Sequence, residues 1–267
     1  MPHPATMAQG AGPRLGPHLE RLLEFTEPHA DDVCLDVARG DGPMPAALGP
    51  QVRHVTSVNA SPPARRSEDG RMSTVTFGTR VPDDEVDGSR PAAPSSGDQV
   101  AHRGSPDATD TNAAALPYDD NSFSLVTAHF SLYSLGDPKR VLRELLRVCR
   151  PGGRIVIADL VRGNLAAQDR DRIERLRDPR HPGTPSIACL TELITTAGAS
   201  IRRLDVFTVE RPLEPWLATA DPHAADQIRT ELLDEVDGGP KTGAKPRLIG
   251  GELWFTQSWA YVAAEPI

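Results

Sequence analysis

Residues 123–160 read FSLVTAHFSLYSLGDPKRVLRELLRVCRPGGRIVIADL and decide the fold. Two apolar runs, Phe123–Ala128 and Arg154–Leu160, are typical of buried strands. Between them, Asp137 supplies an N-cap with a proline directly after it, and the Pro-Gly-Gly at 151–153 ends the helix. A strand, a helix and a strand in this order form a βαβ unit, which predicts a parallel sheet. The helical residues that we expect to face this sheet are Val141, Leu142, Leu145, Leu146 and Val148.

The same alternation extends toward the N-terminus. Val33–Val37 and His54–Val58 have the composition of strands, and His18–Phe25 places its leucines at the spacing of a short amphipathic helix. Strands that alternate with helices predict an α/β, Rossmann-like architecture with helices on both faces of the sheet.

Residues 61–111 depart from this pattern because Pro, Gly, Ser, Asp and Arg dominate them, apart from a short apolar run at Met72–Phe77. We expect residues 78–109 to be a disordered surface insertion, since so polar a segment buries too little apolar area to offset its ordering entropy. A lid over a functional site is the alternative interpretation.

The C-terminal part continues the alternation. We predict helices at Asp169–Arg177 and Cys189–Ala197, and strands at Ser200–Val209 and Glu252–Val262. Between the last two strands, residues 211–247 hold two helical segments, 214–220 and 223–236, which we predict to form a helical cap over the carboxyl end of the sheet. The whole chain, 1–267, is then a single domain.

Composition limits the classes of function. The 267 residues are 38% hydrophobic, enough for a packed core, and the formal net charge of -8 argues against nucleic-acid or anionic-membrane binding. Cys34, Cys149 and Cys189 form no CxxC pair, so we predict neither a disulfide framework nor a metal site. No apolar run has the length of a signal peptide or a membrane span, which predicts a soluble, cytoplasmic protein with a small-molecule ligand.

In open parallel sheets, ligands bind outside the carboxyl ends of the strands. At the end of the first predicted strand, Asp36 is followed by a turn in which Gly40 and Gly42 allow a close approach of the backbone to a ligand. The next helix would add its N-terminal N–H groups. A tight turn with no ligand is the alternative.

Four segments, in order, resemble the motif series of the class I S-adenosylmethionine-dependent methyltransferases, and most closely their ubiquinone/menaquinone C-methyltransferase-like branch. They are residues 36–42, 58–61, 115–126 and 141–156. The resemblance implies a seven-stranded, mostly parallel sheet with an antiparallel last strand, and S-adenosylmethionine lying across the ends of the first, second and fourth strands. The residues that it assigns to the cofactor are Asp36, Ala38, Gly40, Gly42, Asn59, Asn112 and Ala113.

Two of these residues depart from the family pattern. The acid that accepts both ribose hydroxyls in the family is Asn59 here, and the acid near the adenine amino group is Asn112. An amide accepts hydrogen bonds through one neutral oxygen, so we expect weaker binding of the cofactor than in the family, or none. Arg39 and Asp41 also stand where the family has small or neutral residues.

Methyl transfer requires in-line placement of the acceptor and in some cases a base. His129 and Tyr133 follow a predicted strand on the cleft side, and Tyr133 stands where the branch often has His. His181 follows an arginine-rich segment, which favours the neutral form that a base requires. We therefore predict these three as catalytic residues; packing of His129 and a solvated helix end at His181 are the alternatives.

We predict that Arg177, Trp216 and Trp254 contact the substrate, although aromatic residues near a terminal strand also serve as core. Together these features predict S-adenosylmethionine-dependent methyl transfer to a small molecule in specialised, polyketide- or quinone-like metabolism. One alternative is an enzyme of the same fold that no longer transfers methyl, such as a cyclase, isomerase or dehydratase. The other is a pseudo-enzyme that associates with a homologous partner. The sequence leaves open whether the chain forms a homo-oligomer or pairs with a homologous partner.

Overall fold

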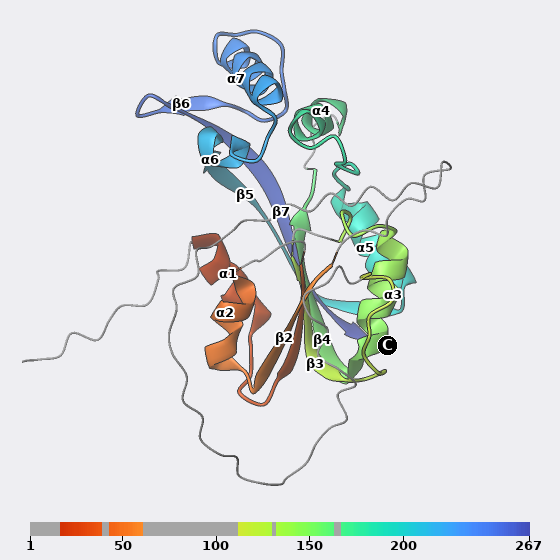
Figure 1. Ribbon diagram of the computed structural model, residues 1–267. Helices are drawn as coiled ribbons and strands as arrows, with labels where there is room; N and C mark the ends of the chain where they lie inside the picture. The colour runs from red at the N-terminus through yellow and green to blue at the C-terminus, as the bar shows by residue number, and fades with distance from the viewer. Residues whose placement is uncertain (1–16, 39–42, 61–111, 130–131, 163–166) are drawn as a thin grey trace, which may run out of the picture.

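The computed structural model describes residues 17–38, 43–60, 112–129, 132–162 and 167–267. Helices cover both faces of a twisted central sheet (Figure 1), which confirms the predicted α/β, Rossmann-like class. The strands are β1 (Val33–Ala38), β2 (His54–Asn59), β3 (Phe123–His129), β4 (Cys149–Leu160), β5 (Ala199–Pro212), β6 (Arg247–Ile249) and β7 (Glu252–Pro266). The predicted insertion at 78–109 and the run Met72–Phe77 lie outside the described residues.

The strand order across the sheet is β2-β1-β3-β4-β7-β5, and β6 pairs with β7. Strands β1 to β4 are mutually parallel, whereas β7 runs antiparallel to both β4 and β5. The sheet is therefore mostly parallel with an antiparallel last strand, as the resemblance implied. The carboxyl ends of β1 to β4 consequently meet at one edge of the sheet.

Two hydrophobic layers enclose the sheet. The helices are α1 (Pro17–Thr26), α2 (Met44–Leu48), α3 (Pro138–Val148), α4 (Ala167–Arg177), α5 (Ile187–Thr196), α6 (Leu213–Leu217) and α7 (Pro222–Val236), with a 3-10 turn at Gly49–Gln51. Helices α1 and α2 cover one face, while α3 and α5 cover the other (Figure 1). None of the described helices is long and apolar enough to cross a bilayer.

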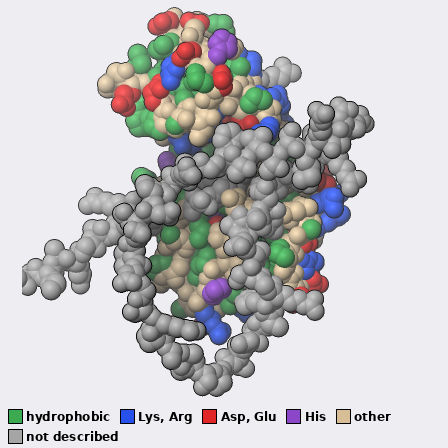
Figure 2. All heavy atoms as spheres, in the orientation of Figure 1, with side chains coloured by type: hydrophobic (Ala, Val, Ile, Leu, Met, Phe, Trp, Pro, Cys, Tyr) green, Lys and Arg blue, Asp and Glu red, His purple; other side chains and the backbone are tan. Residues whose placement is uncertain are grey.

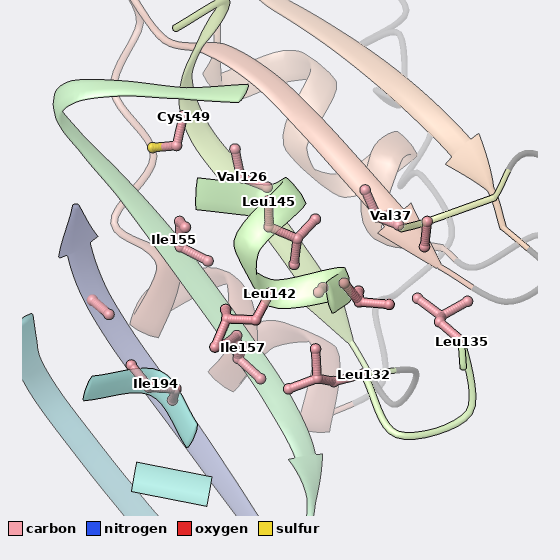
Figure 3. Packing of buried hydrophobic residues seen from close by; sticks show 14 of the residues in the cluster. Val37, Val126, Leu132, Leu135, Leu142, Leu145, Cys149, Ile155, Ile157 and Ile194 are labelled. Atoms are coloured by element: carbon pink, nitrogen blue, oxygen red, sulfur yellow. The ribbon is translucent and has the colours of Figure 1, made fainter. Parts of the chain in front are cut away.

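Helix α3 shows how the sequence produces this packing. The Asp137 carboxylate accepts the N–H of Lys139 at 3.0 Å and caps the helix at the predicted position. Leu142 and Leu145 point from α3 onto Ile155 and Ile157 of β4 (Figure 3). Val141 and Val148 are also fully buried, and Leu146 is partly buried at the margin of the same cluster. The predicted inward face of this helix is confirmed.

The start of β4 differs from the prediction. The strand begins at Cys149, directly after α3. Residues 150–153 are therefore among the first residues of the strand and do not form a loop before it. A register shift against Phe123–Leu125 accommodates this segment. A Cβ on Gly153 would lie 2.9 Å from Arg150 O, Cys149 Sγ and Ser124 O, so only glycine fits.

The far ends of β5 and β7 extend beyond the sheet and carry a distal lobe (residues 213–249), formed by α6, α7 and β6 (Figure 1). The lobe has its own core, in which Ile173 of α4 also takes part. Strand β6 was not predicted, although Gly250-Gly251, both with positive φ, form the two-residue hairpin turn that joins it to β7. Hydrophobic, acidic and basic side chains mix on the lobe surface (Figure 2).

Candidate functional site

A buried carboxylate lies near the carboxyl end of β1. Asp36 is 0% exposed, and its Oδ1 accepts the hydroxyl of Thr127 on β3 at 2.5 Å. His129 Nε2, two residues further along β3, lies 3.3 Å from the same oxygen. Donors from the neighbouring strand therefore satisfy this carboxylate, as a buried charge requires. The structure brings Asp36 and His129, two predicted site residues, into direct contact.

The ends of β1 and β2 lie side by side. Ala38 pairs with Asn59 in the parallel register, and the Ala38 carbonyl accepts the N–H of Ala60 at 2.8 Å. Ala38 is buried, whereas Asn59 is exposed at the end of its strand. The two predicted turn glycines, Gly40 and Gly42, lie outside the described residues. An exposed amide next to a small buried residue thus borders this edge of the sheet.

The segment that carries Asn112 and Ala113 is a turn. Asn112 Oδ1 accepts the N–H of Ala114 at 3.0 Å, and Ala113 is fully buried in the core. The Asn112 side chain therefore stabilises its own turn. A carboxylate oxygen can make the same contact, so the amide at this position is not required by the turn.

Two residues of α3 fix the loop that follows this turn. Glu144 accepts the Leu116 N–H at 2.8 Å, while Arg147 donates to the carbonyls of Leu116 and Tyr118 and to the Asp120 carboxylate. The hydrogen bond from Arg147 lowers the pKa of Glu144. This network spans the loop from the turn to the start of β3 and holds it against the helix.

Sequence reasoning missed Asp159, near the carboxyl end of β4. The residue is 7% exposed; its Oδ1 accepts the Leu160 N–H at 2.9 Å, and its Oδ2 has no hydrogen-bond partner among the described residues. Burial raises the pKa of Asp159 to about 7, although the nearby backbone N–H groups of Leu160, Leu132 and Tyr133 and the His129 ring oppose the rise. Its position after four apolar residues of a central parallel strand was the available signal.

Tyr133 lies in the turn after β3 and faces Asp159. Burial, followed by electrostatic interactions with Asp159 and Cys189, raises the pKa of the Tyr133 phenol to about 12. The phenol therefore keeps its proton at neutral pH. Three strand ends, those of β1, β3 and β4, thus place Asp36, His129, Tyr133 and Asp159 at one edge of the sheet.

His181 lies in the loop between α4 and α5. Its Nε2 is 3.2 Å from Thr184 Oγ1 and 3.8 Å from Asp171 Oδ1. The partners of its ring thus come from α4 and from its own loop, and they include an acid in place of the arginines that the sequence suggested.

The predicted substrate contacts lie at the distal lobe. Arg177 donates to the Trp216 carbonyl at 2.9 Å, and its guanidinium stacks 4.8 Å from the Trp216 ring. Trp216 is buried against Phe255, with ring centroids 4.8 Å apart. Trp254 is half-buried, and its Nε1 has no partner among the described residues. These side chains join α4, α6 and β7.

A cavity of about 40 Å³ opens between the end of β4, helix α4, β7 and the loop before β6. Its lining includes Arg162, Glu174, Lys245 and Gln257, so it is polar. Gln257 donates to the buried Glu174 carboxylate at 3.1 Å. The described residues contain no group of three or more side chains arranged to hold a metal ion.

Comparisons with known proteins relate this arrangement to methyltransferases. Residues 84–157 match the methyltransferase domain family. The demethylmenaquinone methyltransferase of Clavibacter sepedonicus is 36% identical over 132 residues, which are 49% of this chain and 42% of that protein. The chain thus matches less than half the length of this relative. The resemblance to class I methyltransferases of the ubiquinone/menaquinone branch is confirmed.

Two solved structures show the same fold at low sequence identity. The YcgJ protein from Bacillus subtilis has a TM-score of 0.65 and 16% identity, covering 93% of this chain and 97% of its own. The [4+2]-cyclase SpnF has a TM-score of 0.51 and 18% identity, covering 93% of this chain and 80% of its own.

Proposed function

We propose that this chain, which shares its fold and motif series with the class I S-adenosylmethionine-dependent methyltransferases, transfers a methyl group to a small-molecule acceptor. The observation that carries the proposal is the convergence of strand ends, where Asp36, Asn59 and His129 border one edge of a parallel sheet. Ligands of open α/β sheets bind at this edge. The similarity to quinone methyltransferases supports a quinone-like or polyketide-like acceptor of specialised metabolism.

The residues at this edge fit the cofactor. Ala38 is small enough for a close approach, Asn59 presents an exposed amide beside it, and Ala113 lies in a turn that α3 holds in place. In this arrangement Asn59 would bind the ribose, and the turn at Asn112 and Ala113 would bind the adenine. When bound, S-adenosylmethionine supplies a methyl group that its sulfonium already activates, so the protein's main task is placement.

The acceptor side lies toward the distal lobe. Arg177, Trp216 and Trp254 join the lobe to α4 and β7, next to the polar cavity that begins at Leu160. We propose that residues 211–247 cap the bound acceptor and that His129 and Tyr133 border it from the sheet.

Isothermal titration with S-adenosylmethionine and S-adenosylhomocysteine tests the proposal. We expect binding to the wild type, and we expect Asn59→Asp and Asn112→Asp each to tighten it by about tenfold, because charge-assisted hydrogen bonds exceed neutral ones by about 1 kcal/mol or more. Asn121→Asp is the matched control, since Asn121 is exposed and lies before β3, away from this edge. Absence of binding at millimolar cofactor in all four proteins would overturn the proposal.

A second candidate is an enzyme of this fold that no longer transfers methyl. The specific observation in its favour is the pair of amides, Asn59 and Asn112, where the family has acids. A cyclase such as SpnF shares the fold, so the scaffold can serve other chemistry. This candidate, or a pseudo-enzyme subunit with a homologous partner, is favoured if the cofactor does not bind and the two acid variants do not restore binding.

A further inference from the structure

Asp159 is a buried acid near the proposed site, and the function proposed above assigns it no role. It lies one residue beyond Ala158, which pairs with His129 at the end of β3. Residues 160–162, which follow it, line the polar cavity below the distal lobe. Asp159 itself does not line this cavity; its carboxyl group lies near His129 and Tyr133, beside the ends of β3 and β4.

The surroundings of Asp159 do not fully satisfy its carboxylate. The Leu160 N–H bonds Oδ1, and Oδ2 has no hydrogen-bond partner in the described part of the chain. The titratable groups that face it are the His129 ring of β3 and the Tyr133 phenol of the following turn. A buried acid with an unbonded oxygen favours a ligand that brings a hydrogen-bond donor.

We propose, on the basis of the methyl transfer proposed above, that Asp159 accepts the proton of an acidic hydroxyl group, a phenol or an enol, on the acceptor. The acceptor class is thereby an oxygen acid rather than an amine or an isolated double bond. A carboxyl group that titrates near neutral pH is matched to this task, because it is ionised enough to accept a proton and basic enough to hold it.

The step balances without a further reactant. The acceptor forms a bond to the methyl carbon, through its oxygen or through the adjacent ring or enol carbon, while the methyl–sulfur bond breaks and the electron pair of that bond stays on sulfur. The sulfonium charge is thereby lost, and one proton leaves the acceptor hydroxyl. Asp159 Oδ2 takes this proton and later releases it to water. The products are the methylated acceptor, a neutral thioether and one proton.

The neighbouring candidates suit this role less well. His129 Nε2 is within 3.3 Å of Asp36, which orients the ring toward β1. Tyr133 keeps its proton, because its pKa is raised to about 12. Tyr133 is therefore a hydrogen-bond donor that can position the acceptor oxygen while Asp159 takes the proton.

The test uses 4-nitrophenol, whose anion is yellow and whose neutral form is colourless, with the full chain saturated with S-adenosylhomocysteine. At pH 8, where the free Asp159 carboxyl group is ionised, we expect the probe to bind as the yellow anion with a proton held on Asp159 beside it, so binding should take up about one proton from the buffer in the wild type and none in Asp159→Asn. Asp119→Asn is the matched control, because Asp119 is exposed on the loop before β3. In the wild type, the carboxyl carbon resonance of Asp159 should report protonation as the probe binds, which requires no substitution.

The negative results of this experiment have different meanings. Equal proton uptake on probe binding in the wild type and Asp159→Asn would overturn the role of Asp159, and so would a carboxyl resonance that does not respond. Absence of 4-nitrophenol binding to protein that does bind S-adenosylhomocysteine would overturn the assignment of an acidic hydroxyl. Absence of S-adenosylhomocysteine binding would instead overturn methyl transfer itself and this inference with it.

Discussion

Two buried aspartates at opposite edges of the parallel sheet, Asp32 and Asp159, differ in how completely their carboxyl groups are hydrogen-bonded. At the amino edge, the Asp32 carboxylate accepts hydrogen bonds from Ser124 Oγ at 2.7 Å, the His29 N–H at 2.8 Å and Arg154 at 2.6 Å. At the carboxyl edge, Asp159 Oδ1 accepts the Leu160 N–H at 2.9 Å, while Oδ2 has no partner among the described residues. Burial acts to raise the pKa of both residues; at Asp32 the hydrogen bonds outweigh it and lower the pKa, while at Asp159 burial prevails.

This difference indicates what each edge contributes. A fully bonded buried charge ties several elements together, and Asp32 links the loop between α1 and β1 to β3 and β4. An incompletely bonded one costs stability and is retained where it can meet a ligand. We therefore expect substitutions at the amino edge to change stability, and substitutions at the carboxyl edge to change binding.

The largest effect should follow from Asp32→Ala. We expect a loss of about 3 kcal/mol in the free energy of unfolding, because Arg154 and Ser124 lose a buried partner. Since the folded-state pKa is lowered, the contribution is present above the ordinary value of 3.8 and disappears as the pH falls through the folded value. Urea unfolding at pH 7 measures it, with the exposed neighbour Asp31→Ala as control. A loss equal to that of the control would remove the distinction between the edges.

Much of this architecture is readable from local sequence, whereas the role of each edge is not. The cap at Asp137 and the spacing of Leu142 and Leu145 specify α3 without tertiary information. Asp36 and Thr127, in contrast, are 91 residues apart and meet only because β1 and β3 pair. The position of Asp159 after four apolar strand residues is a local signal of a strand end, but its raised pKa depends on burial and on neighbours distant in the sequence, which no local pattern contains.

The next largest effect should follow from Gly153→Ala, also at the amino edge. The added Cβ would lie 2.9 Å from three atoms, two of them backbone oxygens, so we expect a loss of about 2 kcal/mol. Gly49→Ala is the matched control, since no atom lies within 4 Å of its Cβ and its φ is negative. Thermal unfolding of the two variants gives the comparison; similar midpoints would show that the start of β4 adjusts freely.

Asp159→Asn should act in the opposite direction and only at higher pH. Because folding raises the pKa of Asp159 from 3.8 to about 7, ionisation of this carboxyl group costs no free energy of folding below pH 3.8. The cost grows as the pH rises to about 7 and is constant at higher pH. We expect the variant to be more stable than the wild type by about 1–2 kcal/mol at pH 8 and equal to it at pH 4, less than the full shift because an amide also needs partners. Denaturant unfolding across this range measures the difference, and a stabilisation that does not change with pH would contradict it.

The smallest effect concerns two tryptophans of β7 on the carboxyl side. Trp259 Nε1 donates to Gln257 Oε1 at 3.3 Å, whereas Trp254 Nε1 has no partner among the described residues. Trp259→Phe removes a hydrogen bond and should cost about 1 kcal/mol beyond the lost contact area. Trp254→Phe removes an unbonded donor, which stabilises the fold, and some buried contact area, which destabilises it. These effects oppose each other, so we expect the free energy of unfolding to change by no more than about 0.5 kcal/mol. If Trp254→Phe costs as much as Trp259→Phe in urea unfolding, the Trp254 indole is satisfied in solution. The incomplete hydrogen bonding seen at Asp159 would then not extend into the distal lobe.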